Sequence, residues 1–247
     1  MENNKFEKLS NCPYCKSTNL ISLFTARNWF GKTEEKFYLS KCDDCGLIFQ
    51  NPRVKEGNIN AYYTDDLGYY SPPQNKEKDF SIRLKKFLEK KILINYFNYH
   101  HLGNKSLFTK IFLFVFKNKY QINLTPTFVE QGKLLDIGCS HGANLKRMQD
   151  LGWNVVGLEM NKKSADYAKK LGLEVYTDRI EDLDFPAGYF EAIYMSMVLE
   201  HLYDPFISLI RITKWLKPKG QLIFSIPYFS GFEYKFFKEY TYGLHLP

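Results

Sequence analysis

The sequence has few cysteines and no long apolar run. Five cysteines in 247 residues are too few for a small scaffold held together by many disulfide bonds. The most apolar stretches, ILINYF at 92–97 and IFLFVF at 111–116, are much shorter than the roughly 18 residues that a membrane-spanning helix needs. The N-terminal residues also lack the apolar core and cleavage site of a secretory signal. We therefore expect a globular, cytoplasmic protein.

An excess of charge of one sign is missing from most of the chain. The formal net charge is +7, yet residues 76–121 alone hold 11 Lys and Arg against 3 Asp and Glu, a net of +8. The remainder is close to neutral, which argues against a globally basic, nucleic-acid-binding protein. One basic segment instead predicts a local site for a phosphate-bearing partner, or peripheral contact with the inner face of the membrane.

Four of the cysteines form two pairs with the spacing of metal ligands. CPYC contains Cys12 and Cys15, and CDDCG contains Cys42 and Cys45. Two such knuckles bring four thiolates within reach of one Zn²⁺, at about 2.3 Å each. A redox-active pair would need a single CxxC beside a βαβ unit, whereas here two knuckles precede the domain. We predict a structural zinc site, because four thiolates leave no coordination position for a substrate.

Three regions separate along the chain, without internal repeats. Residues 1–73 hold the cysteine pairs and an aromatic linker, and residues 74–130 are basic and helical in pattern. In this helical pattern, one face is shared by Phe80, Leu84, Phe87, Leu88 and Ile94. Residues 131–247 alternate strand-like and helix-like runs. This alternation predicts an α/β, Rossmann-like, doubly wound and mostly parallel sheet, preceded by a zinc-ribbon-like module and a helical segment.

The stretch LLDIGCSHGANL, at 134–145, reads as a strand, a glycine turn and a helix. Gly138 and Gly142 allow close approach of a ligand, and the helix start offers free N–H groups. Glu159 ends the next predicted strand, where a carboxylate can accept both ribose hydroxyls of an adenosine cofactor. The pattern therefore predicts a nucleoside-containing cofactor.

These residues resemble the class I S-adenosylmethionine-dependent methyltransferases, from Lys133 to about Pro227. The family's first motif, an acidic residue followed by GxGxG, is matched at 136–142 with a serine in place of the middle glycine. FEAIYM at 190–195 matches its fourth strand, and DRIEDL at 178–183 stands where relatives contact adenine. The resemblance implies S-adenosyl-L-methionine as cofactor, bound by Asp136, Gly138, Ser140, Gly142, Glu159, Asp178, Ile180 and Met195.

Two further stretches resemble particular branches of this family. Residues 198–228 are similar to ubiquinone-type and sugar methyltransferases. CGLIFQNP, at 45–52, resembles the end of the zinc-binding segment that precedes this domain in some bacterial methyltransferases acting on sugars and cell-surface glycans. Together they imply methyl transfer to a small, hydroxyl-rich acceptor, such as a nucleotide sugar or a lipid-linked glycan.

Glu200 and His201 follow the predicted fourth strand, whose carboxyl end faces the cofactor crevice of a doubly wound sheet. As catalytic candidates, they include an imidazole able to accept a hydroxyl proton near neutral pH. The alternative is that His201 packs or caps backbone groups. Relatives that bind a divalent metal here carry a carboxylate where this chain has Met197. In the glycine turn, we expect Cys139 to pack and His141 to face solvent, with contact between His141 and the methionine end of the cofactor as the alternative.

Two other classes of function stay open. One is an RNA-modifying methyltransferase, because zinc ribbons and basic arms both serve nucleic-acid binding. Against it, IYMSM in the fourth strand differs from the Asn or Asp, Pro-Pro and aromatic pattern typical of enzymes that methylate base amino groups. The other is a non-catalytic module that docks on anionic lipid through the basic segment.

Only five of the family's seven strands are recognisable. The last two normally form a hairpin beside the fifth strand, and the sequence after SIPY is an aromatic segment instead. We therefore expect the C-terminal strands to be missing and Leu222 to Ile226 to form an exposed sheet edge.

Overall fold

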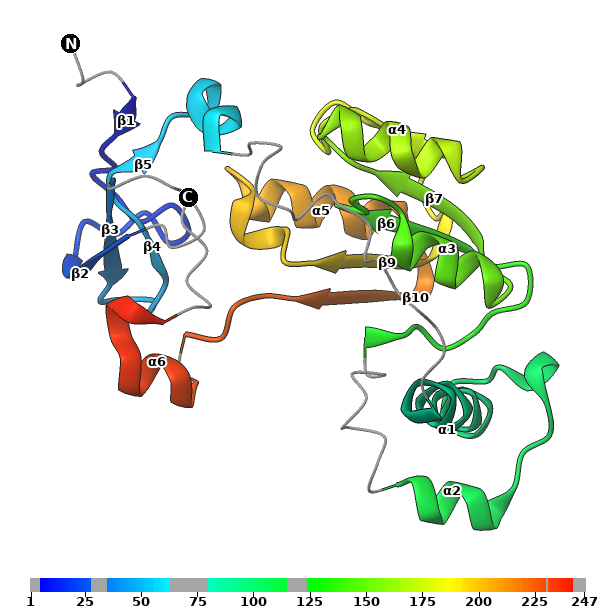
Figure 1. Ribbon diagram of the computed structural model, residues 1–247. Coiled ribbons are helices and arrows are strands. Elements are labelled where there is room, and N and C mark those ends of the chain that lie inside the picture. Colours follow the sequence, from blue (N-terminus) through cyan, green and yellow to red (C-terminus); the bar gives the residue numbers. More distant parts are fainter. Residues whose placement is uncertain (1–4, 28–34, 63–79, 115–123, 230, 242–247) are drawn as a thin grey trace. The chain divides into compact units, whose positions relative to one another are not determined.

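The computed structural model describes residues 5–27, 35–62, 80–114, 124–229 and 231–241 (Figure 1). The chain divides into two compact units. One, the cysteine unit, comprises residues 1–69, 200–206 and 226–247. The other, the sheet unit, comprises residues 70–199 and 207–225. Each unit therefore combines segments that are distant in the sequence.

The sheet unit is built on five parallel strands. These are β6 (Lys133–Ile137), β7 (Asn154–Leu158), β8 (Val175–Tyr176), β9 (Phe190–Ser196) and β10 (Leu216–Ser225). Their order is β10-β9-β6-β7-β8, and every neighbouring pair is parallel. The chain thus starts at the central strand and builds outward first on one side and then on the other. This topology confirms the predicted Rossmann-like fold, and the strand order reverses between β6 and β9, where sheets of this class bind ligands at the carboxyl ends of the strands.

Helices connect consecutive strands of this sheet. They are α3 (Ala143–Asp150), α4 (Lys162–Lys170), the 3₁₀ turn η5 (Leu199–His201) and α5 (Pro205–Trp215). Asn161 caps α4, because its side-chain oxygen accepts the Ser164 N–H at 3.0 Å. The indole of Trp215, at the end of α5, meets the Phe185 ring edge-on at 5.2 Å. The cap therefore stabilises the start of α4, and the aromatic contact stabilises the end of α5.

In its contacts the basic segment groups with the sheet unit, whereas the sequence predicts a region of its own at 74–130. It contains α1 (Phe80–Tyr96), η3 (His100–Leu102) and α2 (Leu107–Leu113). Ile92, Leu93 and Tyr99 are buried in one cluster with Leu134, Met148, Trp153 and Ala192. The segment is held because its apolar residues complete the core under β6 and β9.

The predicted apolar face of this segment is only partly buried. Leu84 and Phe87 are 48% and 56% exposed, whereas Ile94 is buried. Ile92 to Asn95 are buried around the whole circumference of the helix, so burial follows position along α1 and not one face. The side chain of Phe80 and residues 115–123 lie outside the described residues.

The cysteine unit consists of short antiparallel strands. β2 (Leu20–Arg27), β3 (Lys36–Cys42) and β4 (Ile48–Gln50) form one sheet, and β1 (Phe6–Glu7) pairs with β5 (Arg53–Val54), followed by η1 (Glu56–Tyr62). Its small core contains Ala26, Phe37, Leu39 and Val54.

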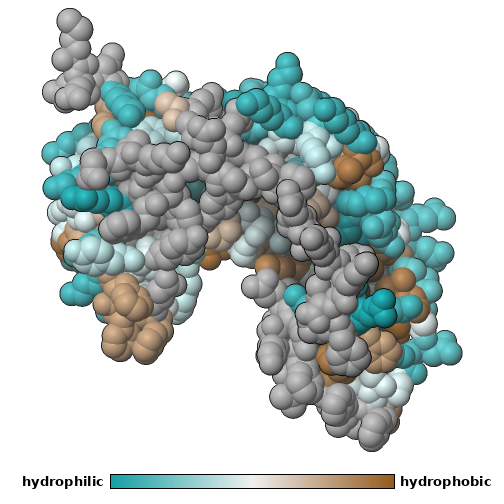
Figure 2. Space-filling model, in the orientation of Figure 1, coloured by the Kyte–Doolittle hydropathy of each residue, from teal (hydrophilic) through white to brown (hydrophobic). Residues whose placement is uncertain are grey.

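The C-terminal residues group with the cysteine unit, whereas the sequence predicts that they belong to a 131–247 domain. They include α6 (Phe232–Phe237) and η6 (Lys238–Tyr240). The rings of Phe229 and Tyr234 lie 6.2 and 5.8 Å from that of Phe24 on β2. These aromatic contacts attach the segment to the cysteine unit. Figure 2 shows apolar surface gathered over α6, where Phe232 is 74% exposed.

Two expectations about surfaces can be compared with the described residues. Within them, β10 pairs with β9 alone, and Phe224 and Ile226 are 43% and 48% exposed. The stretch 222–226 is thus a sheet edge, as expected. None of the helices in the described ranges has the length and apolar content required to span a bilayer.

Replacing Tyr99 by Phe tests the assignment of the basic segment to the sheet unit. The buried Tyr99 hydroxyl accepts the Trp153 indole N–H at 3.0 Å and donates to the Pro126 carbonyl at 3.1 Å. Its loss leaves both buried groups unpaired, so we expect the free energy of unfolding to fall by about 1–3 kcal/mol. Urea unfolding followed by tryptophan fluorescence measures the change. Tyr176→Phe is the matched control, because that hydroxyl forms an exposed bond to Glu174; equal effects of the two variants would contradict the assignment.

Candidate functional site

The glycine turn after β6 has left-handed backbone at three positions. Gly138, Ser140 and Gly142 have φ values of 73°, 50° and 83°. A Cβ on Gly138 would lie 2.4 Å from Cγ2 of Val198, so both backbone strain and a collision exclude a side chain there. Ser140 adopts the conformation that a glycine favours, and the turn therefore keeps its course despite the serine.

Gly142 serves packing between the turn and α4. A Cβ on it would lie 2.8 Å from Cβ of Ala168 and 2.8 Å from Cδ1 of Leu173. Cys139 is 5% exposed and packs in the same cluster. Its sulfur faces Gly157, where an added Cβ would lie 2.7 Å from Sγ. The expected packing role of Cys139 is confirmed, and close packing holds the turn on the sheet.

Glu159 lies directly after β7 and ties the glycine turn to the start of α4. Its Oε2 accepts the Ser140 N–H at 2.8 Å, and its Oε1 accepts the Asn161 N–H at 2.7 Å. The residue is 8% exposed, and burial raises the pKa of its carboxyl despite these two bonds. Each carboxylate oxygen retains capacity for a further donor. Glu159 can therefore shape the turn and also accept two neighbouring hydroxyls of a ligand.

Asp136 is a second buried carboxyl, near the end of β6. It is 2% exposed, and Nδ2 of Asn144 donates to its Oδ2 at 2.9 Å. Burial raises the pKa of Asp136 to about 7, and repulsion from Glu159 acts in the same direction. Two carboxyls at neighbouring strand ends favour a ligand that brings positive charge and hydroxyl donors. Sequence reasoning missed Asn144, and its place in the first turn of α3 is its only sequence signal.

His141 does not face solvent as expected. Its Nε2 is buried and has no hydrogen-bond partner among the described residues, while Nδ1 lies 3.3 Å from Oγ of Ser140. Burial lowers the pKa of the imidazole, which favours the neutral form. An unpartnered polar atom in the turn fits a polar ligand group.

The other predicted cofactor contacts lie at different depths. Asp178 is exposed in the segment after β8, and Ile180 is 3% exposed. Met195 is fully buried in β9, between Ile137 of β6 and Phe224 of β10 in the sheet register. Its side chain is part of the sheet's interior packing, so only its backbone is available for a ligand. The structure thus brings together five predicted residues: Asp136, Gly138, Ser140, Gly142 and Glu159.

The two catalytic candidates belong to the cysteine unit. Glu200 and His201 end η5 and fall in the 200–206 segment of that unit. Glu200 is exposed, and His201 is partly buried. Their catalytic role stays a prediction.

The two cysteine pairs converge in the cysteine unit. The sulfurs of Cys12, Cys15, Cys42 and Cys45 all lie within 4.8 Å of one another, and none forms a disulfide. Cys12 and Cys45 are 3.6 Å apart, and Cys15 and Cys42 are 3.5 Å apart. Tetrahedral Zn–S bonds of about 2.3 Å place sulfurs roughly 3.8 Å apart, so the cluster fits one ion of this size.

Backbone N–H groups also converge on these sulfurs. Those of Ser17 and Leu47 donate to Cys15 and Cys45, respectively. Such bonds support thiolates, which are the form that binds metal. Within the described residues, no other group of three or more His, Cys, Asp or Glu side chains has the spacing of metal ligands.

Comparison with known proteins finds a family similarity in part of the sheet unit. The family described as "Methyltransferase domain" matches residues 135–224. The ubiquinone biosynthesis O-methyltransferase of Alkalilimnicola ehrlichii is 29% identical over 106 residues, covering 39% of this chain and 42% of the relative. That of Actinobacillus pleuropneumoniae is 35% identical over 105 residues, covering 38% and 44%. The matched region thus spans little more than two fifths of these relatives.

Solved structures show the same kind of likeness. An S-adenosylmethionine-dependent methyltransferase from Mesorhizobium loti is 21% identical, with a TM-score of 0.40, covering 43% of this chain and 52% of that one. The YcgJ protein of Bacillus subtilis is 18% identical, with a TM-score of 0.40, covering 42% and 47%. The match of residues 135–224 and the topology of the sheet together identify this part of the chain as a methyltransferase domain of the class I, S-adenosylmethionine-dependent type.

Proposed function

We propose that this chain is an S-adenosylmethionine-dependent methyltransferase that acts on a hydroxyl group of a small molecule. The observation that carries the proposal is the pair of buried carboxyls, Asp136 and Glu159, on either side of a left-handed glycine turn. S-adenosylmethionine is a sulfonium with an ammonium group and a ribose diol, and it supplies an activated methyl group when bound. Its positive charge and its hydroxyl donors would supply the partners that these two carboxyls lack in the free protein.

Each residue of the turn has a distinct part in this proposal. Glu159 accepts the ribose hydroxyls while it keeps the turn in place through Ser140 and Asn161. Asp136 supplies negative charge toward the cationic end of the cofactor. His141 offers its unpartnered Nε2 to a polar group of the ligand. Methyl transfer is an in-line displacement, so alignment and exclusion of water are the main contributions of the protein.

The acceptor we infer is hydroxyl-rich, such as a nucleotide sugar or a lipid-linked glycan. Support comes from the O-methyltransferase names of the relatives and from the resemblance of the cysteine segment to those of glycan-modifying enzymes. The basic segment supports a phosphorylated acceptor, since Arg83, Lys85, Lys86 and Lys90 are exposed on α1. His201 is our candidate for the base that accepts the hydroxyl proton.

We further propose that the four cysteines bind one structural Zn²⁺. Sulfur separations of 3.5 and 3.6 Å support this, together with the small size of the core around Phe37. A unit with so few buried apolar residues needs an additional source of folding energy, and a metal supplies it. Four sulfur ligands leave the ion no open position, so its role is structural.

Metal analysis of the purified protein tests the zinc site. We expect close to one zinc per chain, and loss of that zinc in the double variant Cys42→Ser, Cys45→Ser. Cys139→Ser is the matched control, because Cys139 packs in the sheet unit and lies outside the cluster. An equivalent of zinc that persists in the double variant would contradict the site.

Calorimetric titration with S-adenosylhomocysteine tests the proposed function. We expect Glu159→Ala to weaken binding by about 1–3 kcal/mol, because charge-assisted bonds to the ribose hydroxyls are lost. The exposed Glu174→Ala in the same unit should leave the affinity unchanged. Absence of binding by the unaltered chain, or equal affinity of the two variants, would overturn the proposed function.

A further inference from the structure

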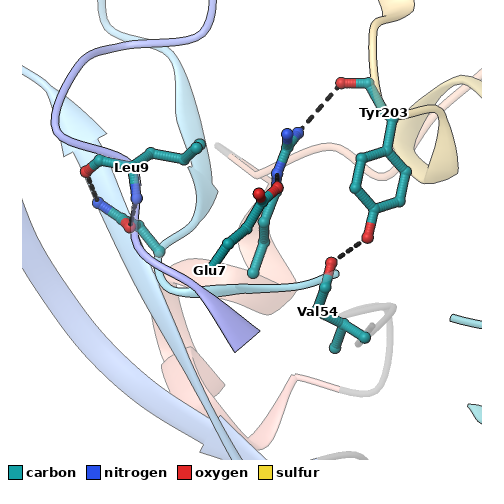
Figure 3. Close-up of polar contacts among 6 residues, drawn as sticks. Glu7, Leu9, Val54 and Tyr203 are labelled. Atoms are coloured by element: carbon teal, nitrogen blue, oxygen red, sulfur yellow. Dashed lines mark hydrogen bonds and ion pairs between the residues drawn. The ribbon is translucent and has the colours of Figure 1, made fainter. Parts of the chain in front are cut away.

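The segment after β9 is held by the cysteine unit through Tyr203. The Tyr203 hydroxyl donates to the Val54 carbonyl, and Nη1 of Arg53 donates to the Tyr203 carbonyl at 3.1 Å. The Arg53 guanidinium also lies over the Tyr203 ring, 4.6 Å from its centroid. Figure 3 shows the Tyr203 hydroxyl directed at the Val54 backbone. Three contacts therefore fix one residue at both its backbone and its ring.

The residues that hold Tyr203 are themselves fixed in the cysteine unit. Arg53 Nε forms an ion pair with Glu7 at 2.6 Å, and the two residues are cross-strand partners in β5 and β1. Val54 is 2% exposed in the core of the unit. Asn51, next but one to Arg53, pairs with both backbone groups of Leu9, at 2.8 and 3.0 Å. This pairing joins β5 to the strand that leads into the first cysteine knuckle.

A second anchor comes from the knuckle itself. Tyr14 lies between Cys12 and Cys15, and its ring stacks on that of Phe206, with centroids 4.5 Å apart and planes at 18°. The paired strands β1 and β5 thus hold the segment at Tyr203, and the first cysteine knuckle holds it at Phe206. Both anchors lie within the cysteine unit.

We propose that Tyr14 and Arg53, acting on Phe206 and Tyr203, are positioning residues through which the four-cysteine site sets the conformation of the segment that carries Glu200 and His201. The inference rests on the proposed function, because it concerns the candidate base of that reaction. The chain leaves the sheet unit after Leu199 and returns to it at Ile207. The candidate base therefore lies in a segment that the cysteine unit holds.

Each anchor makes a distinct contribution to this arrangement. Cys12 and Cys15 would hold a bound zinc ion from both sides of Tyr14, and the bound ion would thereby restrict the position of that residue. Arg53 donates to the backbone carbonyl of Tyr203, and this bond does not depend on neighbouring side chains. The Tyr203 hydroxyl donates to the Val54 carbonyl and so ties the segment to β5. Loss of metal should release the anchor at Phe206, and loss of the Tyr203 ring should release the anchor at Tyr203.

Hydrogen–deuterium exchange on the zinc-loaded full chain tests the proposal without an acceptor. We expect exchange in residues 200–206 to become about tenfold faster in Tyr14→Ala and in Tyr203→Ala, since local opening becomes easier. Tyr203→Phe keeps the ring over Arg53 and should restore part of the protection. Tyr38→Ala, which removes a 47% exposed tyrosine from β3, is the matched control.

A spectroscopic readout separates positioning from general loosening of the unit. With isotope-labelled histidine, the ring resonance of His201, assigned by His201→Gln, should shift in Tyr14→Ala and Tyr203→Ala but not in Tyr38→Ala. Zinc content and slow exchange in β3 report whether the cysteine unit is still folded. Because the Tyr14 side chain is 55% exposed, we expect its removal to leave folding intact. The affinity for S-adenosylhomocysteine should not change in any of these variants.

The outcomes divide clearly. Unchanged exchange at 200–206 and an unmoved His201 resonance in Tyr14→Ala and Tyr203→Ala overturn the positioning role. A chain that fails to bind S-adenosylhomocysteine, yet shows faster exchange in these variants, contradicts the proposed function and leaves the anchoring of the segment standing.

Discussion

The burial of two carboxyls beside one backbone turn is the constraint on which the candidate site depends. Asp136 and Glu159 end neighbouring parallel strands, so the sheet places them close together and away from water. Desolvation of the charged form and mutual repulsion raise the pKa of Asp136 to about 7, which costs the folded state stability at neutral pH. The protein offsets part of this cost with the Asn144 amide and two backbone N–H groups. A ligand with cationic and hydroxyl groups would offset more.

Much of the sheet unit was predictable because its signals are local. Strand-like apolar runs, glycines at a turn and a carboxylate after the next strand lie close in sequence, and parallel topology brings them together. Gly138 and Gly142 were correctly placed in one turn, but for different reasons: one avoids Val198, and the other lets α4 approach. Such neighbours come from distant elements, and no local pattern indicates them.

The errors concern segments whose position depends on long-range packing. Burial of α1 follows its depth in the core and not a single face, because Ile92 and Leu93 enter a cluster with residues more than forty positions away. Each unit also contains segments that are far apart in the sequence. No single boundary along the sequence therefore separates the two units. The sequence allowed two positions for His141, and the burial of its Nε2 is set by packing of the turn and not by its own sequence context.

The central claim is that folding stability is given up at Asp136 in order to bind a cationic cofactor, and Asp136→Asn tests it most directly. A native pKa near 7, against an ordinary value of 3.8, means that the native state holds the proton more tightly. Wild-type stability should therefore decline as pH rises from about 4 to about 7. The asparagine variant should gain on wild type over this range, by on the order of 2–4 kcal/mol above pH 7, and should bind S-adenosylmethionine more weakly. A variant that is less stable than wild type at pH 7.5, or that binds the cofactor equally well, would contradict the account.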